Sequence, residues 1–172
     1  MFRDWQSAYY LKGLSHEIWG MTQFLAWQEE HRATTFSHTT SLYTIGVSAG
    51  AYAAIACGFF LKAHVVWALA PPRTHFDSAE AGQLLASVTD PISTQCLDLA
   101  QLLAQGNGVT EYRIFYNQEF DRDREAGVRL QHCPGVTLHP QPGQGHQIVT
   151  TLNNQGRLPD LLEPFKFTEA NP

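Results

Sequence analysis

Basic residues, cysteines and long apolar runs are all scarce in this 172-residue sequence. Its 11 Lys and Arg are outnumbered by 16 Asp and Glu, which gives a net charge of −5. Nucleic acids and anionic membranes are bound by clusters of basic side chains, so neither partner is expected. No apolar stretch reaches the length of a membrane span, and the opening residues mix charges with aromatic rings, unlike a signal peptide. The sequence therefore predicts a cytoplasmic protein.

The three cysteines, Cys57, Cys96 and Cys133, are an odd number and form no Cys-x-x-Cys pair. Such thiols are typical of a reduced cytoplasmic protein and not of a disulfide framework or a zinc site. No His-x-Glu-x-x-His or His-x-His spacing is present either. We therefore expect no metal, no cofactor and a structural role for each cysteine.

Short apolar segments alternate with stretches of helical periodicity along the sequence. The predicted strands are Leu42 to Gly46, Ala63 to Ala70, Glu111 to Tyr116 and Val136 to His139. The predicted helices are Leu14 to His31, Ala49 to Leu61, Ser78 to Ser87, Ser93 to Ala104, Asp123 to Gln131, Gln147 to Asn154 and Leu158 to Phe165. This alternation predicts an α/β fold, a three-layer α/β/α sandwich with a mostly parallel sheet, in a single domain spanning residues 1–172.

Two segments refine this arrangement. Ala63 to Ala70 is almost continuously apolar after His64, which predicts a strand at the centre of the sheet. Residues 71–107 are long for a simple crossover and are bounded by turn-forming proline and glycine residues. We expect two helices there, which could form a cap over a pocket.

The segment Gly46-Val47-Ser48-Ala49-Gly50 lies between a predicted strand and an Ala-rich predicted helix. A serine on such a sharp strand-to-helix turn, called a nucleophile elbow, presents its hydroxyl for attack on a substrate. Glycines two residues before and after the serine let neighbouring backbone pass close. The helix amino terminus supplies N–H groups for an oxyanion, of which the Ala49 N–H is the expected donor. Ser48 is the predicted nucleophile.

A serine nucleophile needs a base, and His146 is the best placed of the eight histidines. It ends the loop Pro142-Gly143-Gln144-Gly145-His146, after the last predicted strand and just before the final helices. The base occupies this place in the chain order serine, acid, histidine. The alternative is a loop histidine that caps the next helix. His132 and His139 lie near the same strand, and we interpret both as structural.

The acid is expected after the third predicted strand, because strand ends at one edge of a parallel sheet carry the catalytic groups. Glu119, Asp121 and Asp123 all lie there. Asp123 is favoured because it reads as the N-cap of the next helix, which would leave its carboxylate facing His146. Asp121 is the alternative acid. A purely structural reading, in which Asp123 only caps its helix between neutralising arginines, stays open.

Together these features resemble the carboxy-terminal half of α/β-hydrolase-fold serine esterases. The resemblance rests on the elbow from Gly46 to Ala54, the acidic loop after Tyr116, and the segment from Pro134 to His146 with Leu158 to Leu162 behind it. It implies a shortened α/β-hydrolase-like core whose Ser-His-Asp triad cleaves a small-molecule ester or thioester through an acyl-enzyme. The family also has strands ahead of the elbow and a second oxyanion donor on a loop there. No His-Gly-Gly-Gly-type segment is present in this sequence.

Three other functions fit parts of the sequence. An acyltransferase of the same fold would pass the acyl group to an acceptor other than water. The elbow is also similar to that of patatin-like lipases, which use a serine–aspartate dyad, but the Asp-Gly dipeptide of that family is missing. A non-catalytic interaction module would retain the fold without turnover.

The strand at Leu42 to Gly46 is expected at an edge of this short sheet. Apolar edges invite pairing. We therefore expect the Leu42 to Gly46 edge to be covered by the Leu14 to His31 helix, by a second copy in a homo-oligomer, or by a partner chain.

Overall fold

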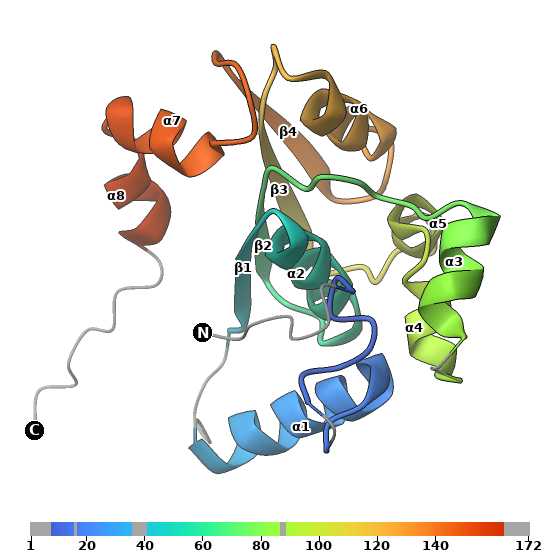
Figure 1. Cartoon of the computed structure of the whole chain (residues 1–172). Coiled ribbons are helices and arrows are strands. Elements are labelled where there is room, and N and C mark those ends of the chain that lie inside the picture. Colours follow the sequence, from blue (N-terminus) through green and yellow to red (C-terminus); the bar gives the residue numbers. More distant parts are fainter. Residues whose placement is uncertain (1–7, 16, 36–40, 87–88, 164–172) are drawn as a thin grey trace, which may run out of the picture.

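The computed structural model describes residues 8–15, 17–35, 41–86 and 89–163. Its centre is a four-stranded sheet in the order β1-β2-β3-β4, and every neighbouring pair is parallel (Figure 1). The strands are β1 (Tyr43–Val47), β2 (Val65–Leu69), β3 (Glu111–Asn117) and β4 (Val136–Gln141). The predicted α/β class with a parallel sheet is thus confirmed. All five residues of β2 are buried, and β2 lies inside the sheet, as its apolar run predicts.

The helices fall into an amino-terminal helix, the crossover helices, and two helices that follow the last strand. They are α1 (Gly20–Thr35), α2 (Ala49–Phe60), α3 (Ser78–Leu85), α4 (Pro91–Gln95), α5 (Leu99–Ala104), α6 (Asp121–Arg129), α7 (Ile148–Asn154) and α8 (Leu158–Leu162). No described helix is both long enough and apolar enough to cross a bilayer.

The two faces of the sheet are covered by different helices. Because strand order follows chain order, right-handed crossovers bring α2, α5 and α6 to one face. The core on that face joins α2 side chains such as Tyr52 and Ile55 to sheet side chains such as Val66 and Ile114. The opposite face is covered by α7 and α8, where Ile148 packs with apolar side chains of β2 and β3. The molecule therefore has helix, sheet and helix layers.

Among the described residues, two of the predicted helices differ most from the structure. The helix expected from Leu14 begins only at Gly20, because residues 8–15 and 17–19 form turns and bends that include a bridge between Gly13 and Trp19. The helix expected over Ser93 to Ala104 is divided into α4 and α5, because Asp98 accepts the backbone N–H groups of Ala100 and Gln101 and starts a new helix. The described residues between 71 and 107 thus form three short helices, and their role as a cap stays a prediction.

The cysteines lie within or beside the larger core. All three are free thiols, and Cys57 and Cys96 are buried. Burial raises the pKa of the Cys57 thiol to about 12, so almost none of it is the reactive thiolate at neutral pH. These two side chains act as small apolar groups in packing.

β1 forms one edge of the sheet, and two of its apolar side chains are unusually open to solvent. Ile45 is 39% exposed and Val47 is 44% exposed. α1 packs against α4 and lies below the sheet in Figure 1, at the end where the strands begin. Among the described residues, no strand pairs with the outer edge of β1.

We therefore predict that the edge of β1 is paired with a strand of a second polypeptide, in the simplest case another copy of this chain. Sedimentation is then expected to give a mass above that of one chain, and the amides of residues 43–47 to exchange slowly. Ile45→Lys is expected to dissociate the assembly, because a charge on an edge strand opposes strand addition. Val128→Lys is the matched control, since Val128 is 40% exposed on α6. A monomer with rapidly exchanging β1 amides would contradict the prediction.

Candidate active site

Ser48 lies on the turn between β1 and α2, with its backbone in a strained conformation. Its φ is 55° and its ψ is −124°, a region that residues with a side chain rarely occupy. The turn is fixed from both sides, because the Ser48 N–H donates to Leu69 O at 2.9 Å and Ser48 O accepts from Ala51 N at 2.9 Å. Ser48 is the N-cap residue of α2, yet its hydroxyl makes no capping bond to the helix. The hydroxyl is therefore free to face other side chains.

The two glycines of the motif have different roles. A Cβ on Gly46 would lie 2.0 Å from Gly50 O, so only glycine lets the end of β1 pass against the first turn of α2. A Cβ on Gly50 would meet no atom within 4 Å. The expectation of close backbone packing is thus correct for Gly46 and wrong for Gly50.

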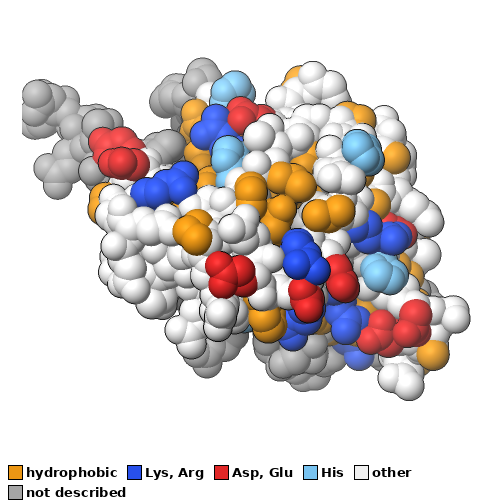
Figure 2. Space-filling model, turned by 90° about the horizontal axis from the view of Figure 1, so that it is seen from above, with side chains coloured by type: hydrophobic (Ala, Val, Ile, Leu, Met, Phe, Trp, Pro, Cys, Tyr) orange, Lys and Arg blue, Asp and Glu red, His pale blue; other side chains and the backbone are white. Residues whose placement is uncertain are grey.

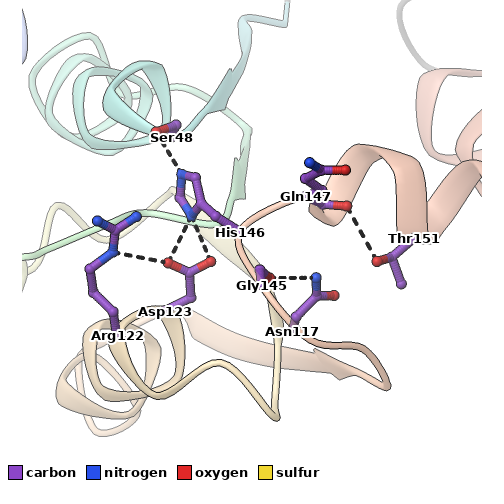
Figure 3. Close-up of polar contacts among 8 residues, drawn as sticks. All are labelled: Ser48, Asn117, Arg122, Asp123, Gly145, His146, Gln147 and Thr151. Carbon is purple, nitrogen blue, oxygen red and sulfur yellow. Dashed lines mark hydrogen bonds and ion pairs between the residues drawn. The ribbon is translucent and has the colours of Figure 1, made fainter.

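His146 faces Ser48 from the loop between β4 and α7 (Figure 3). Its Nε2 lies 2.7 Å from Ser48 Oγ. Its Nδ1 lies 2.8 Å and 2.9 Å from the two carboxylate oxygens of Asp123. A carboxylate only accepts hydrogen bonds, so Nδ1 carries the ring proton and Nε2 accepts the hydroxyl proton of Ser48. The alternative reading of His146 as a helix cap does not hold, because Gln147 is the N-cap residue of α7.

Asp123 is fully buried in the first turn of α6. The helix begins at Asp121, with Phe120 as its N-cap residue, so the prediction that Asp123 caps the helix is wrong. Its carboxylate nevertheless faces His146, because a position inside the first turn directs it towards the histidine loop (Figure 3). Arg122 Nε lies 3.8 Å from this carboxylate, too far for a hydrogen bond. The strong partner of Asp123 is therefore the imidazole.

The other candidates from the sequence lie elsewhere. The Asp121 side chain is 75% exposed and pairs with Arg124 at 2.7 Å. Glu119 is also exposed. His139 stacks on Phe115 with a centroid separation of 4.5 Å, and burial next to two arginines lowers its pKa. The structure thus gathers Ser48, His146 and Asp123 and leaves the remaining candidates apart.

Asn117, which the sequence pattern did not single out, holds the histidine loop in place. It ends β3, is fully buried, and donates from Nδ2 to Gly145 O at 2.9 Å (Figure 3). Its Oδ1 is buried without a hydrogen-bond partner and packs beside Gly143, where a Cβ would lie 3.3 Å away. The sequence did offer a signal for Asn117, because a polar residue stands at the end of a buried strand, where that strand reaches the site.

The amino terminus of α2 is the part of this site suited to an anion. The Ala49 N–H is one of the first four N–H groups of α2, which have no acceptor within the helix, and it adjoins Ser48. In α/β-hydrolase-fold esterases, a loop ahead of the elbow supplies a second N–H donor. We identify no equivalent donor among the described residues. No group of three or more metal-ligating side chains occurs in the described part of the chain either.

Comparisons with known proteins add a weak likeness to solved structures. No family model matches the sequence, and no curated protein is similar to it. A solved structure described as brefeldin A esterase, a bacterial homologue of human hormone-sensitive lipase, is similar with a TM-score of 0.46 and 18% sequence identity. The alignment covers 90% of this chain and 53% of that one, so this chain spans about half the length of the esterase.

The two glycines of the elbow give a matched pair of variants. Gly46→Ala is expected to lower the free energy of unfolding by about 3 kcal/mol, because overpacking against backbone forces the turn apart. Gly50→Ala is expected to be neutral or slightly stabilising, because alanine favours a helix more than glycine does. Urea unfolding of both variants measures the difference. Equal effects of the two substitutions would contradict the described turn.

Asn117→Ala is expected to loosen the loop that carries His146, since it removes the donor to Gly145 O. The measurement is the downfield proton NMR resonance of the His146 Nδ1–H, which is expected to broaden or disappear in this variant. Asn107→Ala is the matched control, because Asn107 Nδ2 also donates to a backbone carbonyl, Phe59 O, at 2.9 Å. Both residues of this bond are far from His146 in the sequence. An unchanged resonance in folded Asn117→Ala would show that the loop holds its place without Asn117.

Proposed function

We propose that this chain is a serine hydrolase that cleaves an ester or thioester. The observation that carries the proposal is the continuous chain of contacts from Ser48 Oγ through the His146 ring to the buried Asp123 carboxylate. These three side chains come from three separate strand ends of one sheet edge. A nucleophile, a base and an orienting acid in that order form the arrangement that activates a serine hydroxyl.

In the first half-reaction, His146 Nε2 takes the Ser48 proton as Oγ attacks the carbonyl carbon of the substrate. The Ala49 N–H donates a hydrogen bond to the resulting oxyanion. The dipole of α2 also favours negative charge at the amino terminus of this helix. Collapse of the tetrahedral intermediate breaks the bond to the leaving alcohol or thiol, which receives the proton from His146. The acyl group is then an ester of Ser48.

In the second half-reaction, His146 takes a proton from water as the water oxygen attacks the acyl carbon. Collapse returns the proton to Ser48 Oγ and releases a carboxylic acid. The buried carboxylate of Asp123 keeps the ring oriented and stabilises the imidazolium in both halves. An alcohol or amine in place of water would make the same site an acyltransferase.

The strained backbone of Ser48 supports this role independently of the hydrogen bonds. Non-glycine residues at positive φ persist only where the surroundings hold them, and they gather at functional sites. The face of the molecule seen in Figure 2, above the ends of the strands, combines apolar side chains at its centre with charged side chains and histidines around them. Such a surface suits a substrate with both apolar and polar parts.

The decisive test is reaction with a fluorophosphonate probe followed by mass spectrometry. Labelling is expected at Ser48 and is expected to be absent in Ser48→Ala. With a small activated ester, His146→Ala is expected to lower kcat by about 10³-fold or more. Asp123→Asn is expected to lower it by about 10²- to 10⁴-fold, because it disturbs the tautomer of the imidazole.

Asp121→Asn is the matched control, because Asp121 lies two residues from Asp123 yet points to solvent. It is expected to leave turnover unchanged. A folded protein that the probe does not label would instead identify a non-catalytic interaction module. Labelling that survives His146→Ala with full turnover would point to a dyad of the patatin-like kind.

A further inference from the structure

Beside the amino-terminal turns the described residues line an open, shallow cavity of about 320 Å³ that the proposed mechanism does not use. We call it the Arg73 cavity; its lining includes Tyr9, Lys12, Arg73, Phe76 and Glu80. Two of its walls come from segments far apart in the sequence, namely the amino-terminal turns and the stretch that follows β2. Neither Ser48 nor His146 lines it. The Arg73 cavity is therefore separate from the site formed by Ser48 and His146.

The charges of the Arg73 cavity favour an anion. Its two cationic side chains, Lys12 and Arg73, exceed its one acid, Glu80. The Arg73 guanidinium lies 5.0 Å from the ring centroid of Phe76 and 5.7 Å from that of Tyr9, and it pairs with Glu80 at 2.8 Å. The two rings hold the guanidinium within the cavity by cation–π attraction. The Glu80 carboxylate therefore occupies the position in which the carboxylate of a ligand could pair with Arg73.

The backbone around the cavity is strained and firmly held. Tyr9 and Tyr10 have φ values of 56° and 65°, and Ala70, three residues before Arg73, has a φ of 49°. Aromatic residues are rare in this region of φ, and such strain is concentrated at functional sites. The buried Ser93 hydroxyl donates to Leu11 O at 2.7 Å, which fixes the segment that carries Tyr9 and Lys12.

Two connections bring the Arg73 cavity close to Ser48. Tyr52, one helical turn after Ser48, packs its ring against Tyr9 and Phe76 with centroid separations of 5.4 Å and 5.6 Å. The Ser48 N–H donates to Leu69 O, and Arg73 follows Leu69 by four residues. Through Tyr52, the cavity thus adjoins the first turns of α2, the helix that Ser48 caps.

We propose that the Arg73 cavity binds a carboxylate at the far end of the acyl chain of the substrate. The inference rests on the proposed hydrolase function and narrows its substrate class to half-esters or half-thioesters of dicarboxylic acids. The carboxylate pairs with Arg73 and Lys12, the chain crosses the aromatic rings of Tyr9 and Phe76, and the scissile carbonyl reaches Ser48. Glu80 competes with the carboxylate for Arg73 and limits its affinity.

The test compares two aryl esters of equal length, mono-4-nitrophenyl suberate and the 4-nitrophenyl ester of suberic acid monoamide. The measured quantity is the ratio of kcat/KM for the carboxylate ester to that for the amide ester. Arg73→Gln and Lys12→Gln are each expected to lower this ratio about tenfold, the value of one charge-assisted hydrogen bond. Glu80→Gln is expected to raise it, because the glutamine can keep the helix-capping contact while the competing charge is lost.

Arg32→Gln is the matched control, because Arg32 also pairs with a glutamate, Glu29, at 2.7 Å but does not line the cavity. It is expected to leave the ratio unchanged. A ratio that stays constant in Arg73→Gln and Lys12→Gln overturns the inference, as does a loss shared equally by both esters in all three cavity variants. The ratio of kcat/KM is expected to fall in Arg73→Gln and to rise in Glu80→Gln. Such opposite changes are not expected of side chains that only support the fold.

A second measurement separates this inference from the hydrolase proposal. Calorimetric titration of Ser48→Ala with suberate and with neutral suberamide reports binding without turnover. Tighter binding of suberate, weakened by the further change Arg73→Gln, supports the cavity even if neither ester is hydrolysed. Hydrolysis at Ser48 together with equal binding of suberate and suberamide overturns the cavity and leaves the hydrolase proposal standing.

Discussion

The contact between the end of β1 and the first turn of α2 is the constraint on which the rest of the site depends. Gly46 passes so close to the backbone of Gly50 that no side chain fits between them. In the turn that follows this approach, Ser48 has a positive φ, and its hydroxyl makes no hydrogen bond to the helix that it caps. The same turn is joined to β2 by the bond from the Ser48 N–H to Leu69 O. The sheet thus holds a strained residue and fixes the position of its hydroxyl.

The parallel sheet explains how distant residues meet at this hydroxyl. In a parallel sheet every strand ends at the same edge, so the segments after β1, β3 and β4 come together although they are far apart in the chain. Asp123 follows β3 and His146 follows β4, and Asn117 at the end of β3 ties the two segments through Gly145. The parallel order of the strands is thus what brings these groups into hydrogen-bond contact.

The sequence predicted the sheet better than it predicted the limits of the helices. Strands such as Val65–Leu69 are read easily because a strand buried on both faces is continuously apolar. The start of α6 was misplaced, because Asp121 and Asp123 both suit a helix start and only packing places Phe120 at the N-cap. Asn117 was not singled out because its partner, Gly145 O, lies 28 residues away and is brought near only by the fold. The Arg73 cavity was hidden for the same reason, as its walls come from separate segments.

The division of the helices between the two faces of the sheet places the His146 loop beside the smaller of the two apolar cores. All the crossover helices lie on one face. In the part of the chain that the structure describes, the other face is covered by α7 and α8 alone, two short helices packed on a few apolar side chains. His146 stands two residues before α7. Local opening needs less free energy than global unfolding where few apolar contacts are lost. Detachment of the last two helices would carry the His146 ring away from Ser48 while the sheet and α2 stayed folded. Loss of the contact between Ser48 and His146 is therefore expected to need less free energy than unfolding of the whole protein.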